Sequence, residues 1–349
     1  MSTTRQNKIT RSLRVRLRPF REEDYPRFVE IGNLSDPEFR WTVEEARYQD
    51  ASWDHRRYVK RRFVAEDASG QVVGYGRINH VPDEFHPRKY YLCVVVDPAY
   101  RRRGVGAAIY ECLLAELRSR RAAAARSGVS KETETESIQF LTRRGFTEVQ
   151  RGWQVRLDVA SVDLARFAGA GDRAAGQGIT LTPLAAEQAR DPDALRKAYE
   201  LTIACERDVP STDPVTETSF EHFLSYAVRS PNALPEAFFI ALDWARYVGL
   251  SALYRPLALP GVLNQGLTGV RREYRGRGIA MALKLLTVRY ARERGYREIR
   301  TWNDHRNQPM LRINEALGFV KQPAWITFEK SLVPGLAQDS HPVAVRELP

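Results

Sequence analysis

Two kinds of hydrophobic pattern recur along the chain, in the same order in its first and second halves. Short runs rich in apolar residues predict strands, and these lie at 14–19, 63–66, 72–78, 179–183, 238–242 and 247–253. Apolar residues spaced three to four apart predict helices at 22–31 and 187–206, and most clearly at 278–294. Strands that alternate with helices indicate an α/β or α+β fold with a mixed sheet.

The two halves also resemble each other residue by residue. Residues 94–109 (VVVDPAYRRRGVGAAI) align with residues 268–283 (TGVRREYRGRGIAMAL) at a constant separation of 174, so that Gly104 matches Gly278. A chain of 349 residues is too long for one ordinary core. We therefore predict two domains, at 1–158 and 178–335. An Ala- and Gly-rich linker at 159–177 joins them, and a tail follows at 336–349.

Composition is typical of a globular protein, with 43% hydrophobic and 28% charged residues. Nothing stays apolar for the roughly 18 residues that a membrane helix needs, and the polar N-terminus does not resemble a secretory signal. The three cysteines are widely spaced and form no CxxC pair. They favour buried apolar positions in a reducing compartment, so we expect a cytoplasmic protein with no metal site and no membrane partner.

The net charge of +11 comes mostly from residues 1–170. The arginines are scattered, and the sequence contains no basic tail, zinc finger or helix-turn-helix. We therefore expect no nucleic-acid partner. A basic surface of this kind suits a polyanionic ligand such as coenzyme A equally well.

An Arg-x-x-Gly-x-Gly/Ala segment follows an apolar strand and opens a helix in both halves. The first turn of a helix offers free N–H groups and a positive dipole end to a pyrophosphate. Glycine allows close backbone approach, and arginine adds charge-assisted bonds. A single copy fits a plain helix start as well, but the repeated flanking pattern favours a phosphate site. Its residues are Arg101, Arg102, Arg103, Gly104, Val105 and Gly106, and then Arg275, Gly276, Arg277, Gly278, Ile279 and Ala280.

This segment resembles motif A of the GNAT superfamily, the Gcn5-related N-acetyltransferases, from Val270 to Ala280 and more loosely from Val96 to Gly106. The Gly-Phe pairs at 145–146 and 318–319 resemble the end of motif B. The resemblance covers residues 13–158 and 178–332. It implies two tandem folds, each a mixed, splayed sheet flanked by helices, with acetyl-CoA as co-substrate and no metal.

The resemblance also implies where the co-substrate binds. The pantetheine arm would lie in the splayed sheet, and the backbone N–H groups of Thr268, Gly269 and Val270 would orient the thioester carbonyl. The Arg-x-x-Gly-x-Gly/Ala segment would hold the diphosphate. Val96 ends the corresponding strand of the first half.

The second half keeps more of the family pattern than the first. Residues 301–319 (TWNDHRNQPMLRINEALGF) resemble a GNAT branch in which asparagines contact pantetheine or substrate, here Asn303 and Asn307. Asn307 fits equally well as a helix cap before Gln308-Pro309. Many GNAT enzymes protonate the departing thiolate with a tyrosine, which is replaced here by Leu141 and Asn314. Leucine donates no proton, whereas Asn314 can hold a water, so we expect catalysis mainly in the second half.

Acetyl transfer to an ammonium group also requires a base. Glu206 and Asp208 follow an apolar helix, in the region that builds the acceptor pocket of GNAT enzymes, and a catalytic or a surface role fits them equally. The predicted activity is transfer of acetyl from acetyl-CoA to a primary amine of a small molecule. A protein N-acetyltransferase and a non-catalytic acyl-CoA-binding protein are the alternatives. The sequence identifies no particular amine and fits a monomer or a homodimer.

Overall fold

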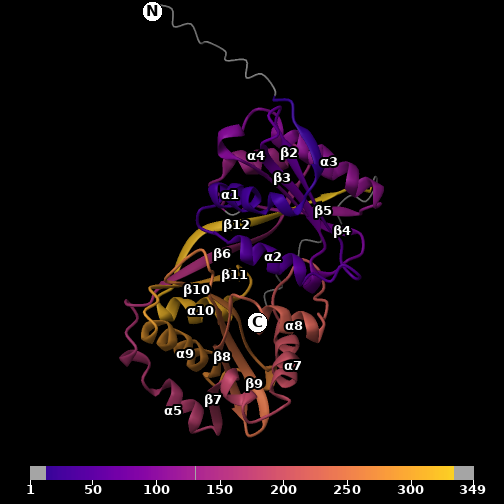
Figure 1. Cartoon of the computed structure of the whole chain (residues 1–349). Helices are drawn as coiled ribbons and strands as arrows, with labels where there is room; N and C mark the ends of the chain where they lie inside the picture. Colours follow the sequence, from indigo (N-terminus) through magenta and orange to yellow (C-terminus); the bar gives the residue numbers. More distant parts are fainter. Residues whose placement is uncertain (1–12, 130, 334–349) are drawn as a thin grey trace, which may run out of the picture.

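The computed structural model describes residues 13–129 and 131–333, and the predicted tail at 336–349 lies outside these ranges. Two lobes, each a sheet with helices on its faces, lie end to end (Figure 1). The first half of the sequence forms β1 (Arg16–Pro19), α1 (Tyr25–Ser35), α2 (Val43–Ala51), β2 (Lys60–Glu66), β3 (Val72–Asn79), β4 (Lys89–Val96), α3 (Val105–Ser119), β5 (Ala124–Val129), α4 (Thr135–Thr142) and β6 (Thr147–Asp158).

The second half of the sequence repeats this order with two additional helices, one before its first strand and one more between its first and second strands. It forms α5 (Gly169–Ala175), β7 (Ile179–Pro183), α6 (Leu184–Gln188), α7 (Ala194–Glu206), α8 (Phe220–Ala227), β8 (Ala233–Asp243), β9 (Arg246–Tyr254), β10 (Val262–Val270), α9 (Ile279–Glu293), β11 (Glu298–Asp304), α10 (Gln308–Leu317) and β12 (Val320–Ser331). The mixed α/β architecture with its flanking helices confirms the predicted fold class.

One helical region differs from its prediction. The stretch predicted as a helix over 187–206 is divided into α6 and α7, with residues 189–193 between them. Pro192 lies in this break. A proline disfavours helical geometry at the residue before it and cannot donate a backbone hydrogen bond. The apolar spacing continued across the break and concealed it.

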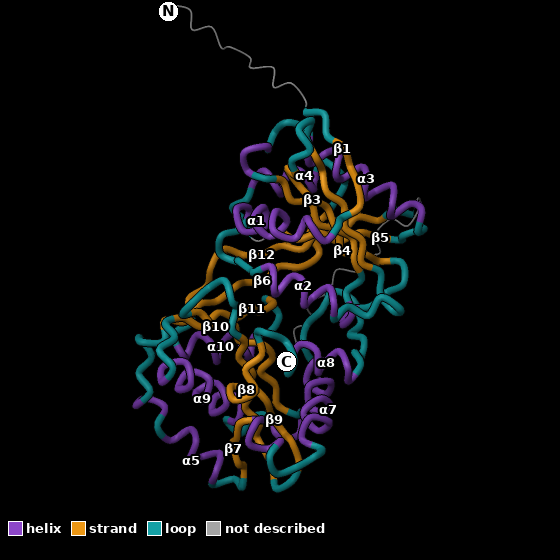
Figure 2. Tube along the Cα trace, viewed as in Figure 1, coloured by secondary structure: helices purple, strands orange, loops and turns teal. Residues whose placement is uncertain are grey.

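A single sheet of twelve strands runs through both lobes, in the order β1-β2-β3-β4-β5-β12-β6-β11-β10-β9-β8-β7. Figure 2 shows the strands continuing from one lobe into the other. Among the strand pairs only β4–β5 and β10–β11 are parallel within the described part of the chain. Each parallel pair is bonded over three residues, and then the two strands part. Each lobe therefore has a splayed sheet, as the resemblance implied.

The two lobes exchange their last strands. β6 pairs with β11 of the second lobe, and β12 pairs with β5 of the first lobe. The side chains follow the strands, because Val155 and Leu157 of β6 are buried in the core of the second lobe. Ile326 and Phe328 of β12 are buried in the core of the first lobe. Each core therefore contains residues from the other half of the sequence.

The segment predicted as a linker at 159–177 packs against the second lobe. It contains α5, and Val162, Ala170 and Ala174 are buried in the second core. The guanidinium of Arg292 on α9 donates to the carbonyl oxygens of Val159 at 2.8 Å and Val162 at 2.6 Å. These bonds fix the segment on α9.

Replacing Phe328 with alanine should destabilise the first lobe, although the residue lies near the end of the chain. The ring is 3% exposed within the first core, and such a truncation costs about 3–5 kcal/mol. Urea denaturation should show this loss, with faster amide hydrogen exchange in β5. Val320→Ala, at a position of β12 that is 64% exposed, should stay within about 0.5 kcal/mol of the unchanged protein. Equal effects of the two substitutions would contradict the exchange of strands.

Candidate active site

The two Arg-x-x-Gly-x-Gly/Ala segments adopt the same backbone path. Gly104 and Gly278 precede the first residues of α3 and α9, with φ of 86° and 80°. Two residues earlier, Arg102 and Gly276 are also left-handed, with φ of 62° and 76°. At Gly278 an added Cβ would meet no atom within 4 Å. The helix start is thus open on the side of this glycine, which fits a diphosphate approaching the free N–H groups of the first turn.

Arginine side chains of and next to the second segment form hydrogen bonds that hold the turn in place. Arg275 donates from Nε to the carbonyl of Val270 at 3.0 Å, and its guanidinium also binds the carboxylate of Asp208. Arg272 donates from Nε to the same carboxylate at 2.9 Å. In the first segment Arg101 likewise donates to the carbonyl of Val96, at 3.3 Å.

Asp208 therefore lies beside the turn rather than free in a pocket. Its hydrogen bond with Arg272 and its contacts with Arg275 lower the pKa of its carboxyl group. A carboxylate held by two guanidinium groups is a weak proton acceptor. The geometry favours a positioning role for Asp208.

The end of β10 lies where β10 and β11 part. A bulge between Gln265 and Thr268 interrupts the pairing of β10 with β9, and bulges re-aim the backbone groups around them. The hydroxyl of Thr268 lies 2.8 Å from that of Ser251. At Gly269 an added Cβ would come within 2.5 Å of the Cβ of Cys205, so this glycine allows α7 to pack closely on β10.

A cleft of about 400 Å³ lies beside this parting of the strands. Both halves of the sequence line it, because the short turn 82–84 of the first half faces α7 and β10 of the second. Its polar lining consists of Asp83, Glu84, Glu206, Ser211, Gln265, Thr268, Lys284, Thr301, Asn303 and Asn307. The cleft thus joins the predicted thioester-orienting strand to one of the predicted bases.

Glu206 is the carboxyl group best suited to accept a proton in this cleft. Burial and, to a smaller extent, the nearby charge of Asp83 raise its pKa to about 7. The pKa of Asp83 is itself raised, chiefly by desolvation. A base whose pKa lies near neutrality is matched to deprotonating an ammonium group at physiological pH.

The predicted asparagines form a buried pair and a cap. Asn314 donates from Nδ2 to Oδ1 of Asn303 at 2.7 Å, and the two residues are 1% and 8% exposed. Asn307 caps α10, where its Oδ1 accepts the N–H of Met310 at 3.4 Å. Both Asn303 and Asn307 also line the cleft. For Asn307 the two sequence interpretations, cap and site residue, are therefore compatible.

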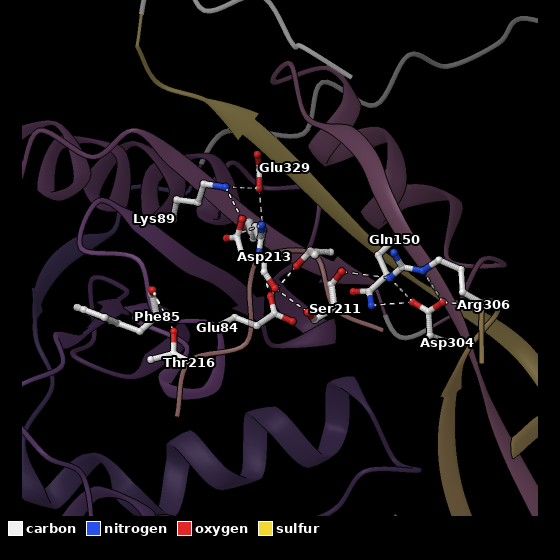
Figure 3. A network of polar contacts seen from close by, with 12 residues as sticks. Glu84, Phe85, Lys89, Gln150, Ser211, Asp213, Thr216, Asp304, Arg306 and Glu329 are labelled. Carbon is white, nitrogen blue, oxygen red and sulfur yellow. Dashed lines mark hydrogen bonds and ion pairs between the residues drawn. The ribbon is translucent and has the colours of Figure 1, made fainter. Parts of the chain in front are cut away.

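The first half of the sequence holds one wall of the cleft in place. In the segment 211–216, Asp213 accepts a hydrogen bond from Lys89 at 2.7 Å and forms an ion pair with Arg126 at 2.8 Å. The hydroxyl of Thr212 donates to Glu84 at 2.6 Å. Figure 3 shows this network converging on Asp213 and Glu84. Ser211 lines the cleft at the start of the segment, so the first lobe shapes the second lobe's site.

The parting of β4 and β5 in the first lobe is crossed by an aromatic side chain. A Cβ added to Gly128 of β5 would lie 2.3 Å from the hydroxyl oxygen of Tyr91, on β4, and 3.1 Å from Nε1 of Trp325. These two side chains therefore stand where the strands separate. The first lobe keeps the turn at Gly104 but has bulky groups at the base of its splay.

Three charged residues of the cleft were not predicted as site residues, namely Asp83, Glu84 and Lys284. The two acids belong to the other half of the sequence, and no local pattern relates them to Glu206. Lys284 lies within the predicted helix 278–294, between Leu283 and Leu285. A lysine between two leucines of an amphipathic helix was the available indication that this position faces inward.

The chain belongs to the acetyltransferase (GNAT) family, whose model matches residues 28–146 and again residues 197–319. It is 24% identical over 262 residues to a mycothiol acetyltransferase of Pseudarthrobacter chlorophenolicus, an alignment that covers 74% of each chain. Family membership agrees with the resemblance on which the sequence predictions rested.

Solved structures show the same fold. A tandem GNAT protein from the clavulanic acid biosynthesis pathway superimposes with a TM-score of 0.70 at 20% identity, over 92% of this chain and 99% of that one. A GCN5-related N-acetyltransferase from Sphaerobacter thermophilus superimposes with a TM-score of 0.64 at 18% identity, over 93% and 98%.

Within residues 13–129 and 131–333, no helix is long and apolar enough to span a membrane. The same residues contain no group of three or more His, Cys, Asp or Glu side chains placed to hold a metal ion.

Proposed function

We propose that the protein transfers the acetyl group of acetyl-CoA to a primary amine of a small molecule, and that the second lobe carries out the chemistry. The observation that carries this proposal is the cleft in which Glu206 faces the end of β10. There a base with a pKa of about 7 lies beside the strand that orients the thioester in the family's fold. The size of the cleft, about 400 Å³, and its walls from both lobes suit a small acceptor better than a peptide.

In this proposal the turn at Gly278 binds the co-substrate, and the cleft holds the acceptor and the base. The turn and the first N–H groups of α9 bind the diphosphate, while Asp208 holds Arg272 and Arg275 in place. Glu206 removes a proton from the acceptor's ammonium group, and backbone N–H groups near Thr268 stabilise the charge that develops on the thioester oxygen. Asp83 and Glu84 add negative charge at the cleft, which attracts a cationic amine.

Thiol release from acetyl-CoA, measured over a panel of small amines and lysine peptides, tests the proposal. We expect release with at least one small amine and slower release with peptides. Calorimetric titration with acetyl-CoA should detect binding in parallel. Tight binding without turnover on any amine would instead indicate a non-catalytic acyl-CoA-binding protein, and faster turnover on peptides would indicate a protein acetyltransferase.

A further inference from the structure

Lys284 is a buried ammonium group in the wall of the cleft. It lies on α9 and is 1% exposed, and it lines the cleft together with Thr268 and Asn303. Within the described ranges no carboxylate, carbonyl or hydroxyl group pairs with its Nζ, which lies 4.9 Å from the centre of the Phe319 ring. Lysine is almost never fully buried unless it is paired. An unpaired lysine at the edge of a cleft therefore requires a functional explanation.

The position expected to supply a proton does not do so. Asn314 occupies it, and an amide is no acid at neutral pH. The side chain of Asn314 is also engaged with Asn303 and is 1% exposed. Phe319, against which Lys284 rests, donates its backbone N–H to the carbonyl of Asn314 at 3.0 Å. Lys284 and Asn314 are thus both in contact with Phe319.

We propose that Lys284 is the proton donor for the thiolate of coenzyme A that departs from the acetyl group. This inference rests on the proposed function, because it assigns one step of that reaction. It makes Lys284 a catalytic residue that takes over the role of the missing tyrosine.

The protons balance in the following way. Glu206 takes a proton from the acceptor's ammonium group, and the amine nitrogen forms a bond to the acetyl carbon. The carbon–sulfur bond breaks with its electron pair remaining on sulfur, and the ammonium of Lys284 gives a proton to that sulfur. Glu206 passes this first proton to water, then takes the second proton of the nitrogen and passes it to water as well, and Lys284 recovers one proton from water. One proton is released for each acetyl group transferred.

The environment of Lys284 supports proton donation. Burial alone lowers its pKa to about 7, so the ammonium is a far stronger acid than an exposed lysine. The carboxyl groups that line the same cleft are Asp83, Glu84 and Glu206, and none of them contributes to this shift. A donor with a pKa near the working pH transfers its proton efficiently to a departing thiolate.

The repeat provides a control position. Tyr110 of α3 corresponds to Lys284, and Leu141 corresponds to Asn314. The hydroxyl of Tyr110 accepts a bond from Lys330 at 3.2 Å in the first core. Tyr110→Phe therefore removes a polar group from the matched helix position, outside the cleft.

The decisive experiment titrates the thiol of bound coenzyme A, because this readout needs no turnover. Thiolate absorbance is followed against pH in the complex, and the complex with desulfo-coenzyme A is subtracted. In this complex a thiolate next to the ammonium raises the pKa of Lys284 while the ammonium lowers the pKa of the thiol, so the two groups titrate as a pair. We therefore expect the pKa of the bound thiol to be lower in the unchanged protein than in Lys284→Met by about one unit or more. Tyr110→Phe should match the unchanged protein. Identical curves for the unchanged protein and Lys284→Met would overturn the proposal, even if no amine were ever acetylated.

With an amine that the protein acetylates, kinetics give a second test. Lys284→Met should lower kcat by on the order of 100-fold, as expected for loss of a general acid, and change KM for acetyl-CoA little. In the unchanged protein kcat should fall as pH rises above about 7, because the donor loses its proton. This alkaline decrease should be absent in Lys284→Met. A full kcat with the decrease intact would refute the assignment while leaving the proposed activity established.

Discussion

Replacing Gly278 with valine is expected to raise KM for acetyl-CoA by on the order of 100-fold or more, which corresponds to about 3 kcal/mol of lost binding. The side chain would extend into the open space at the start of α9, where an added Cβ now meets no atom within 4 Å. It would keep the diphosphate away from the N–H groups of the first turn. Initial rates of thiol release at varied acetyl-CoA concentrations measure the effect.

Gly295, just past the other end of α9, provides a matched control. Its φ is 72° against 80° at Gly278, and an added Cβ there also meets no atom within 4 Å. Gly295→Val therefore introduces the same backbone strain, about 1–2 kcal/mol, into the same helix. Both variants should melt at similar temperatures, whereas only Gly278→Val should weaken acetyl-CoA binding. An unchanged KM in Gly278→Val would refute the placement of the diphosphate in the second lobe.

Replacing Glu206 with glutamine should lower kcat/KM by on the order of 100- to 1,000-fold, because the cleft loses its proton acceptor. In the unchanged protein kcat/KM should rise with pH through about 7, the pKa of Glu206, since only the deprotonated carboxylate accepts a proton. This acid limb should disappear in the variant. Glu221 lies on α8 and forms an exposed ion pair with Arg229. Glu221→Gln should therefore keep both the rate and the rise of kcat/KM with pH.

The free energy of unfolding reports the pKa of Glu206 without any need for turnover. Its pKa is raised in the folded protein, so the proton stabilises the fold. That contribution is fully present below the pKa of the unfolded chain and is lost as pH rises through about 7. Glu206→Gln should therefore gain stability relative to the unchanged protein as pH rises from about 4.5 to about 7 in urea denaturation. A constant difference across this range would contradict the raised pKa.

The sequence predicts what is local or repeated. The turns at Gly104 and Gly278 could be found because they need particular residue types at fixed spacing, and because they occur twice. The strands β3 and β9 follow from their short apolar runs, and in the structure both faces of each strand are largely buried. Asn307 as a cap follows from its place just before Gln308-Pro309. Such features depend on neighbours within a few positions along the chain.

What the sequence does not predict depends on contacts between distant residues. Nothing in the composition of β12 distinguishes pairing with β5 from pairing with β11, because both partners offer the same backbone groups and an apolar face. The closeness of Asp83 to Glu206 results from the packing of one lobe on the other. Lys284 was not singled out from the sequence, since a lysine is normally solvated, and the packing around Phe319 shows that it is buried.

The exchange of β6 and β12 also determines the order in which a newly made chain can complete its structure. Synthesis proceeds from the N-terminus, and domains that follow one another usually fold in turn as they leave the ribosome. Here β12 emerges after the other strands and helices of the second lobe, yet it completes the sheet beside β5. The first lobe therefore stays incomplete, with the edge of β5 uncovered, until the second lobe has been translated. We expect chaperones to bind this uncovered strand edge until β12 pairs with it.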